Sequence, residues 1–297
     1  MKSAFDIMKF IWNHPLASKR RSYAIRRFFN WQISQRIFPA PVIFPFVENS
    51  VLIVEKGMTG ATGNIYTGLM DFEEMSFVLH LLRENDLFAD IGANIGVFSV
   101  LASVNAGANT VAIEPVPGTF SRLVRNIRAN NMSEKICPRQ IGVGSERGEI
   151  LFSSNHDTIN HVLTDWEIKQ NVPSVKVHVS TIDEIFNSEC PCLIKMDVEG
   201  FEWPALQGAK RTMSDSRLKA IIIEINGSGS SYGISDDEIH SFLLSQGLTP
   251  YSYEPFSRTL TSLDKYGPTN TIYLRDPEWI EQRVSTARKF EIFNCKI

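Results

Sequence analysis

Residues that could bind a small polar ligand are concentrated in the segment Asp90–Gly96, whose sequence is DIGANIG. The segment follows a short apolar run, and ligands of open α/β sheets bind at such strand ends. Gly92 permits a sharp turn, and Gly96 lets the next helix begin close to the strand. Asp90 offers a carboxylate to a cationic group. Asn94 stands where the dinucleotide fingerprint G-x-G-x-x-G has the glycine that makes room for a pyrophosphate, so the pattern favours a ligand without one.

A second acid, Glu114, ends the next predicted strand, 24 positions after Asp90. A carboxylate at this position can accept hydrogen bonds from both hydroxyl groups of a ribose. We therefore assign Glu114 to the same ligand site, together with Ala93, Pro115 and Gly142. A strand, a glycine turn, a helix and a second-strand acid in this order indicate a cofactor site.

A third motif, LIKMDVEGFE at Leu193–Glu202, completes a resemblance. Together with DIGANIG and Ile113-Glu114-Pro115, it resembles the FkbM family of S-adenosylmethionine-dependent methyltransferases, over roughly residues 87–248. The resemblance implies an α/β, Rossmann-like class I methyltransferase fold with a seven-stranded sheet. It also implies S-adenosylmethionine as the cofactor, which has no pyrophosphate, and O-methylation, typically of sugars or polyketide-like natural products.

Methyl transfer to an alcohol needs an aligned nucleophile and removal of its proton. Three side chains are candidates for this catalytic role: Asp197, Glu199 and His161. The motif favours Asp197, at the end of the fourth strand, for positioning cofactor or substrate. Glu199 follows near a helix start, where acids are favoured electrostatically. His161 lies in a polar insertion, roughly 153–173, and a histidine ionises near neutrality, as a base should.

Other acids are expected at the same edge of the sheet, namely Glu202 and Glu224. Several carboxylates at one edge are also an alternative Mg²⁺ site. Because alkyl transfer does not require a metal, we assign none. The pair Cys190 and Cys192 is a poor zinc site, since no second pair lies nearby.

Strands alternate with helices over most of the chain, which predicts a mostly parallel, doubly wound sheet. The predicted strands are Leu87–Ile91, Thr110–Glu114, Ile136–Val143, Val175–Val179, Leu193–Met196, Ala220–Ile225, Thr249–Glu254 and Asn270–Leu274. The predicted helices are Phe72–Arg83, Val97–Val104, Thr119–Asn130, Ile182–Phe186, Glu202–Met213 and Asp236–Ser245. The last two strands are joined by a polar stretch too short for an obvious helix, so an antiparallel last strand is expected.

Four segments are distinguished along the chain: a basic helical extension (1–47), a segment preceding the core (48–86), the methyltransferase domain (87–278) and a tail (279–297). Ser18–Ile37 predicts a helix whose apolar stripe consists of Ile25, Phe28, Phe29 and Ile33. A strand is expected at Ser50–Val54. The glycine-rich stretch 57–68 predicts a loop, either a flexible hairpin or a lid over the cofactor.

The net charge of −3 conceals an asymmetry, because residues 1–47 sum to +7 and the other 250 residues to −10. A basic leader on an acidic body can bind phosphates, anionic lipid or its own body. Either the helix of this leader lies peripherally at a membrane surface, or it packs on the catalytic body or on a second subunit. With four cysteines and no apolar run of membrane-spanning length, we expect a soluble, cytoplasmic protein.

Competing functions remain. The expected acceptor is a small molecule or glycan. A nucleic-acid methyltransferase is disfavoured by the acidic body, since phosphate backbones call for a basic face, although the basic leader could supply one. A non-catalytic cofactor-binding interaction protein has little need for Asp90, Glu114 and Asp197 together. A nicotinamide oxidoreductase is disfavoured by Asn94.

Overall fold

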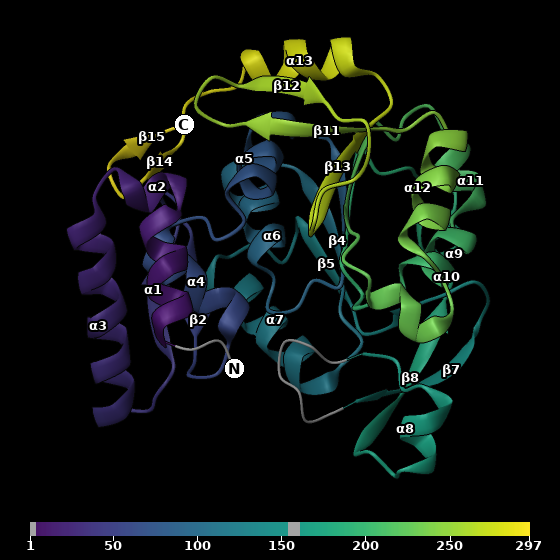
Figure 1. The fold of residues 1–297 in the computed structure, drawn as a ribbon, viewed down its shortest axis with the longest axis horizontal. Coiled ribbons are helices and arrows are strands. Elements are labelled where there is room, and N and C mark those ends of the chain that lie inside the picture. The colour runs from purple at the N-terminus through teal and green to yellow at the C-terminus, as the bar shows by residue number, and fades with distance from the viewer. Residues whose placement is uncertain (1–3, 154–160) are drawn as a thin grey trace.

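A computed structural model describes residues 4–153 and 161–297. Its centre is an eight-stranded sheet (Figure 1) in the order β12-β11-β13-β10-β9-β3-β4-β5. The strands, from one edge to the other, are β12 (Thr259–Ser262), β11 (Thr249–Glu254), β13 (Asn270–Leu274), β10 (Ala220–Glu224), β9 (Leu193–Met196), β3 (Leu87–Ile91), β4 (Asn109–Ile113) and β5 (Ile136–Arg139).

The five strands from β10 to β5 are parallel, and β13 is antiparallel to both of its neighbours, β10 and β11. The α/β, Rossmann-like fold and the antiparallel last strand are thus confirmed. The edge strand β12, which pairs with β11, is an eighth strand that the sequence did not indicate. It forms because the polar stretch after β11 turns back as a hairpin.

Helices cover both faces of this sheet. Strands β3, β9 and β10 are therefore almost continuously buried, which is why each reads as an apolar run. Helices of the core region are α5 (Phe72–Leu81), α6 (Val97–Val100) with the π-helix η1 (Leu101–Asn105), α7 (Pro117–Ala129), α9 (Ile182–Phe186), α10 (Glu202–Gln207), α11 (Lys210–Ser214), the 3₁₀-helix η3 (Ser228–Tyr232) and α12 (Asp236–Ser245). Capping boxes begin α9 and α12, where Thr181 and Ser235 pair with the acid three positions later.

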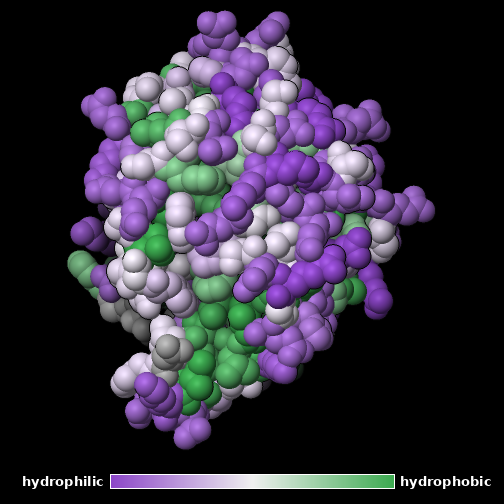
Figure 2. Space-filling model, turned by 90° about the vertical axis from the view of Figure 1, so that its right-hand side faces the viewer, coloured by the Kyte–Doolittle hydropathy of each residue, from purple (hydrophilic) through white to green (hydrophobic). Residues whose placement is uncertain are grey.

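A small three-stranded sheet projects from the core. Its strands, in the order β6-β8-β7, are β6 (Gly142–Val143), β8 (Ser174–Ser180) and β7 (Gly148–Ser153), and α8 (Asp165–Lys169) lies beside them. The single strand predicted over 136–143 is wrong, since the chain leaves the main sheet after Arg139 and pairs with β8 instead. Residues 154–160 of the predicted insertion lie outside the described residues. In Figure 2, hydrophobic residues gather towards the lower end of the molecule, at the height of β7 and β8.

The N-terminal segment contains α1 (Ala4–Asn13), α2 (Pro15–Ser18), α3 (Arg21–Ile37) and the hairpin β1 (Val42–Pro45)–β2 (Val51–Val54). The predicted helix 18–37 is present as α3. Its predicted apolar stripe is wrong in part, because Phe28 is buried whereas Phe29 and Ile33 are more than half exposed. The face that packs on the body is instead formed by Ala24, Phe28, Trp31 and Gln35.

The glycine-rich stretch predicted as a loop is also wrong, because it forms helix α4 (Thr59–Thr67). Asn64 is buried there, donating to the Gly60 carbonyl and accepting from the Met70 amide. Tyr66 packs edge-on against Phe28 with ring centroids 5.2 Å apart. Tertiary packing against α3 thus overrides the low helix propensity of glycine.

The C-terminal residues pack on both the core and the N-terminal segment. Helix α13 (Pro277–Ser285) lies against α5, and β14 (Glu291–Ile292) pairs with β15 (Cys295–Lys296). Phe290, Ile292 and Ile297 belong to the same buried cluster as Ile11 and Phe28. In the described part of the chain, no helix is both long enough and apolar enough to cross a membrane.

Candidate functional site

The segment Asp90–Gly96 forms a tight turn between β3 and α6. The amides of Gly92 and Ala93 both donate to the Ile113 carbonyl, at 3.0 and 2.9 Å, which joins the turn to β4. Gly92 has a φ of +77°, and a Cβ there would lie 1.8 Å from the Asp197 carbonyl oxygen. Only glycine fits this position, because the turn passes directly against the end of β9.

Glu114 ties the end of β4 to the same turn. Its Oε2 accepts from the Asn94 amide at 3.0 Å and its Oε1 from the Val116 amide at 2.9 Å. Burial raises the pKa of Glu114 to about 7. Each carboxylate oxygen has a second lone pair, so Glu114 can cap these amides and still accept hydroxyl donors. Pro115 follows it and is half-buried.

Gly142 lies in the small sheet. A Cβ at Gly142 would meet Val179, His178 and Val177 of β8 before any atom of the glycine turn. Its predicted place in the cofactor site therefore stays a prediction that these contacts do not support. The seven other predicted residues are brought together around the ends of β3 and β4: Asp90, Gly92, Ala93, Asn94, Gly96, Glu114 and Pro115.

A buried row of charges lies behind the turn. Asp90 is 1% exposed, and its Oδ2 accepts from the Ser99 hydroxyl at 2.6 Å. Its Oδ1 is buried and has no hydrogen-bond partner within the described residues. On β9, the Lys195 ammonium donates to Asp197 Oδ2 at 3.0 Å. Oδ1 of Asp90 is thus an acceptor suited to a donor group of a bound ligand.

The pKa values of these groups follow from burial and from one another. Burial raises the pKa of Asp90, and the positive charge of Lys195 opposes this rise. Burial alone would lower the pKa of Lys195, but the carboxylates of Asp197 and Asp90 outweigh it and raise that pKa. Lys195 therefore stays charged and neutralises two acids on neighbouring strands.

More acids line the edge next to Asp197. Glu199 has a φ of +54°, and burial, followed by the negative charge of Asp197, raises its pKa to about 7. Glu202 is buried and accepts from the amides of Val198 and Gly200, at 3.0 and 3.3 Å. Burial and then Asp197 raise the pKa of Glu224 to about 8. Carboxyl groups are thus concentrated at this edge, as the sequence indicated, and burial raises their pKa values.

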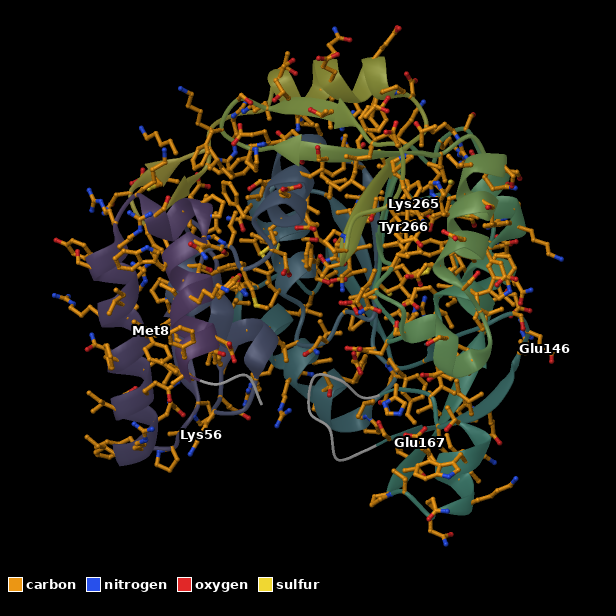
Figure 3. All side chains as sticks on the ribbon, viewed as in Figure 1. Met8, Lys56, Glu146, Glu167, Lys265 and Tyr266 are labelled. Carbon is orange, nitrogen blue, oxygen red and sulfur yellow. The ribbon has the colours of Figure 1, made fainter. Side chains whose placement is uncertain are left out.

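His161 is held near this edge by an ion-pair partner that the sequence did not indicate. Its Nε2 lies 2.9 Å from Oε1 of Glu167 on α8, which is labelled in Figure 3. Hydrogen bonds from Thr164 and His161 lower the pKa of Glu167 to about 2. A positive charge on His161 lowers the pKa of Glu199, so the two side chains interact electrostatically. Tyr232 of η3 donates to the Val162 carbonyl at 2.6 Å, which anchors the segment that carries His161.

Two residues that contact the predicted acids, Lys195 and Ser99, were not predicted from the sequence. Lys195 lies within the motif LIKMDVEGFE. A lysine inside a strand that is otherwise apolar is itself a signal, because a buried lysine is almost always paired. Ser99 carries no comparable signal, since a serine in the first turns of a helix is common.

Across residues 4–153 and 161–297, no group of three or more His, Cys, Asp or Glu side chains could hold a metal ion.

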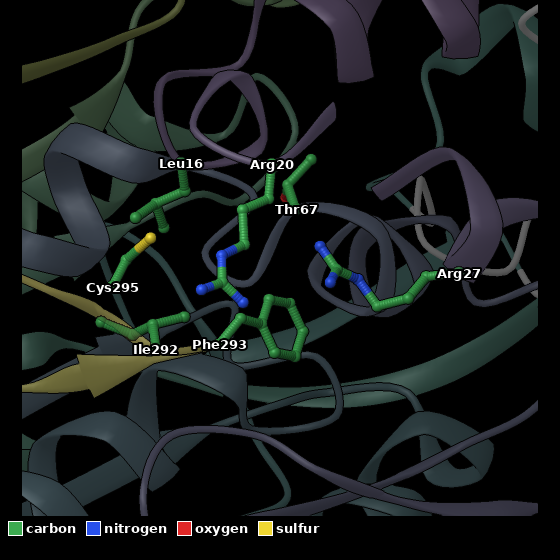
Figure 4. A pocket seen from close by; sticks show the side chains of 7 residues that line it. All are labelled: Leu16, Arg20, Arg27, Thr67, Ile292, Phe293 and Cys295. Carbon is green, nitrogen blue, oxygen red and sulfur yellow. The ribbon is translucent and has the colours of Figure 1, made fainter. Parts of the chain in front are cut away.

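A small recess lies away from this site, between α2, α3 and the β14–β15 hairpin (Figure 4). There Arg27 donates to the Tyr66 carbonyl and lies over the ring of Phe293, 3.8 Å from its centroid. The recess joins the two ends of the chain and contains none of the predicted site residues.

The arrangement can bind a ligand that carries both a cationic or donor group and a pair of hydroxyls. The buried Oδ1 of Asp90, which has no partner within the described residues, can accept a hydrogen bond from the cationic or donor group, and the Glu114 carboxylate can accept from the two hydroxyls. The groups that ionise near neutrality on the neighbouring strand, Glu199 foremost, can accept a proton beside that ligand.

The central part of the chain is similar to known proteins. Residues 90–249, more than half of the chain, match the family described as methyltransferase FkbM domain. The hexuronic acid methyltransferase AglP of Haloferax volcanii is 29% identical over 155 residues, which are 50% of this chain and 59% of that protein. Methyltransferase 1 of Beauveria bassiana is 27% identical over 149 residues, which are 42% of this chain and 59% of that protein. The chain thus spans 59% of the length of each of these curated relatives.

A solved structure is similar at lower identity. Methyltransferase FkbM from Methylobacillus flagellatus KT is 21% identical, with a TM-score of 0.42, over 64% of this chain and 43% of that one.

Proposed function

The chain belongs to the FkbM methyltransferase family, and we propose that it transfers a methyl group from S-adenosylmethionine to a hydroxyl group of a sugar or glycan. The proposal rests on two pairs of acidic side chains that lie next to each other at one edge of the sheet. The first pair is Asp90 and Glu114, and the second pair is Asp197 and Glu199. The carbonyl of Asp197 packs directly on Gly92, so a ligand held at the turn lies beside the second pair.

The residues of the first pair fit this cofactor. Asp90, whose Oδ1 is buried without a partner, suits the ammonium of the methionine moiety. Glu114 suits the ribose hydroxyls, and Asn94 leaves out the glycine that a pyrophosphate would need. The bound cofactor would supply an electrophilic methyl group on a positively charged sulfur. The turn and Glu114 orient it, and the carboxylates around it offset its charge.

In this proposal Glu199 accepts the proton of the acceptor hydroxyl. Its pKa of about 7 makes it partly ionised at neutral pH and basic enough to take that proton. Asp197 is less suited, because its Oδ2 is already bound to the Lys195 ammonium. His161, held by Glu167, tunes Glu199 through its charge and helps to position the acceptor.

The name of the Haloferax volcanii relative, hexuronic acid methyltransferase, supports a sugar as the acceptor. The charge at the edge favours a neutral sugar over a uronic acid. After burial, the negative charges of Asp197, Glu199 and Glu202 raise the pKa of Glu224, so an additional carboxylate on the acceptor would be repelled. We therefore expect a neutral glycoside to be the better substrate.

Two measurements test the function. Calorimetry should show tighter binding of S-adenosylhomocysteine than of NAD, and mass spectrometry should show a gain of one methyl group on neutral glycosides. Glu199→Gln should lower the rate by roughly 10²–10⁴ and abolish the rise of the rate with pH around 7, with cofactor affinity unchanged. Glu189→Gln, at an exposed carboxylate of the same chain, is the matched control. An unchanged pH profile in Glu199→Gln would remove Glu199 from the reaction, and tighter binding of NAD would overturn the function itself.

A further inference from the structure

Helix α3 is apolar on two opposite faces. Ala24, Phe28 and Trp31 are buried against the body. Arg26, Phe29, Ile33 and Ile37 recur at intervals of three and four residues on the opposite side, and the three apolar members are between 51% and 66% exposed. A helix that is apolar on both faces is ordinarily covered on both. Figure 1 shows α3 as the outermost helix on its side of the molecule, so the second face has no cover within the described chain.

Further exposed apolar side chains extend this surface. On α1, which packs against α2 and α3, Phe5 and Trp12 are exposed, and Met8 (Figure 3) is half-buried against the body. Phe38, directly after α3, is 75% exposed. Of the 14 large apolar side chains that are exposed in the described residues, ten belong to residues 5–43. Isolated exposed apolar residues are ordinary, but a concentration of this kind marks an interaction surface.

Cations surround these side chains. The exposed ones are Lys9, Lys19, Arg20, Arg21, Arg26 and Arg36. Within the described residues, neither Lys9 nor Arg21, Arg26 or Arg36 forms an ion pair with a carboxylate. Arg21 lies instead over the ring of Trp12, 4.8 Å from its centroid. Aromatic rings interleaved with unpaired cations are typical of surfaces that lie at a bilayer interface.

We propose that the outer face of α1–α3 binds the surface of a membrane that carries anionic headgroups. Phe5, Trp12, Phe29, Ile33 and Ile37 would insert at the headgroup level, and the surrounding arginines and lysines would contact lipid phosphates. This interaction is independent of the proposed methyl transfer. Because the rest of the chain has a net charge of −10, an anionic membrane would repel the acidic body and attract the basic segment, which orients the protein with α1–α3 towards the membrane.

Charge favours an anionic membrane over the two other partners that could bind an apolar, basic face, namely a second copy of the chain and nucleic acid. A symmetric dimer would place the same surface on both sides of its interface, so the +7 segment would face a second copy of itself. Nucleic acid would use the cations but would leave aliphatic side chains such as Ile33 and Ile37 exposed or covered by phosphate. Anionic lipid is complementary to both the charge and the apolar surface.

Co-sedimentation of the full chain with vesicles tests the proposal. We expect binding to phosphatidylcholine vesicles in which about a third of the lipid is anionic phosphatidylglycerol. Binding should be weaker without the anionic lipid and should be lost as the salt concentration is raised. Phe29→Ser/Ile33→Ser should weaken binding about tenfold or more, because two large apolar side chains no longer leave water. Arg26→Glu/Arg36→Glu should do the same through charge.

Matched controls come from the other side of the molecule. Leu244→Ser removes an exposed apolar side chain from α12, and Lys210→Glu reverses an exposed cation at α11. Both should bind vesicles as the unchanged chain does. All variants should keep their melting temperature and their affinity for S-adenosylhomocysteine, which shows that they are folded. If the full chain does not bind anionic vesicles, the proposal is wrong. If Phe29→Ser/Ile33→Ser changes the oligomeric state of the protein in light scattering without changing vesicle binding, the proposal is also wrong and the face is a subunit contact.

Discussion

Lys195 offers the sharpest test of the buried charges behind the glycine turn. It is 6% exposed and lies between Asp90, which is also buried, and Asp197, to which it donates at 3.0 Å. Lys195→Met keeps most of the volume of the side chain and removes the ammonium. The variant therefore leaves Asp90 with a buried negative charge that no cation offsets.

The expected magnitude follows from this exposure. Removing one partner of a buried ion pair costs about 3–5 kcal/mol. The side chain of Asp197 is 34% exposed, so water can replace part of its lost partner, and we expect the lower end, about 3 kcal/mol. At about 2–4 °C per kcal/mol, the melting temperature should fall by about 6–12 °C.

The effect should also depend on pH. Loss of Lys195 removes the charge that lowers the pKa of Asp90, so this pKa rises further above its usual range. At pH 5 Asp90 can then take up a proton and avoid the uncompensated charge, whereas at pH 8 ionisation is more strongly favoured. The loss of stability should therefore be larger at pH 8 than at pH 5.

Calorimetric melting of a matched pair of variants measures this. Lys219→Met is the control, because Lys219 pairs with Asp276 at 3.2 Å through side chains that are 23% and 42% exposed, and such pairs contribute about 0–1 kcal/mol. Lys195→Met/Asp197→Asn should be no worse than the single variant. Equal losses for Lys195→Met and Lys219→Met, or a loss for Lys195→Met that is the same at both pH values, would refute the reasoning.

Four further outcomes are expected. Gly92→Ala should abolish binding of S-adenosylhomocysteine in calorimetry, since its methyl group would lie 1.8 Å from the Asp197 carbonyl oxygen; retained binding would show that the turn can shift. Glu114→Ala should weaken that binding about tenfold or more, because a charge-assisted hydrogen bond is worth about 1.5–3 kcal/mol, and an unchanged affinity would restrict Glu114 to capping amides. His161→Ala should keep the affinity but move the midpoint of the pH–rate profile upward, because the charge on His161 lowers the pKa of Glu199; a midpoint that does not move would disconnect the two residues. Between pH 4.5 and 8 the melting temperature of the ligand-free chain should fall as pH rises, since carboxyl groups whose folded-state pKa is raised, such as Glu114, stabilise the fold when protonated, and a rising melting temperature would contradict the raised values.

Much of the fold and of the candidate site could be predicted because its signals are local. The run Leu193–Met196 is apolar enough to identify a buried strand, and the glycines of Asp90–Gly96 follow such a run directly. The capping pair Ser235 and Glu238 begins α12 at the residue where periodicity begins. Neighbouring residues determine these features, so their order along the chain was sufficient to predict strand, turn and helix.

Contacts between distant segments decided the rest. Gly92 must be glycine because β3 and β9 are neighbours in the sheet, which brings it against Asp197, 105 positions later. Strand adjacency also places Lys195 between two acids. The glycine-rich stretch became α4, and α3 buried Trp31 while exposing Ile33, because the body offers one apolar surface to each helix. Periodicity shows that a helix has an apolar face, but only the packed structure determines which of two apolar faces is buried, since burial depends on the partner surface and not on the helix alone.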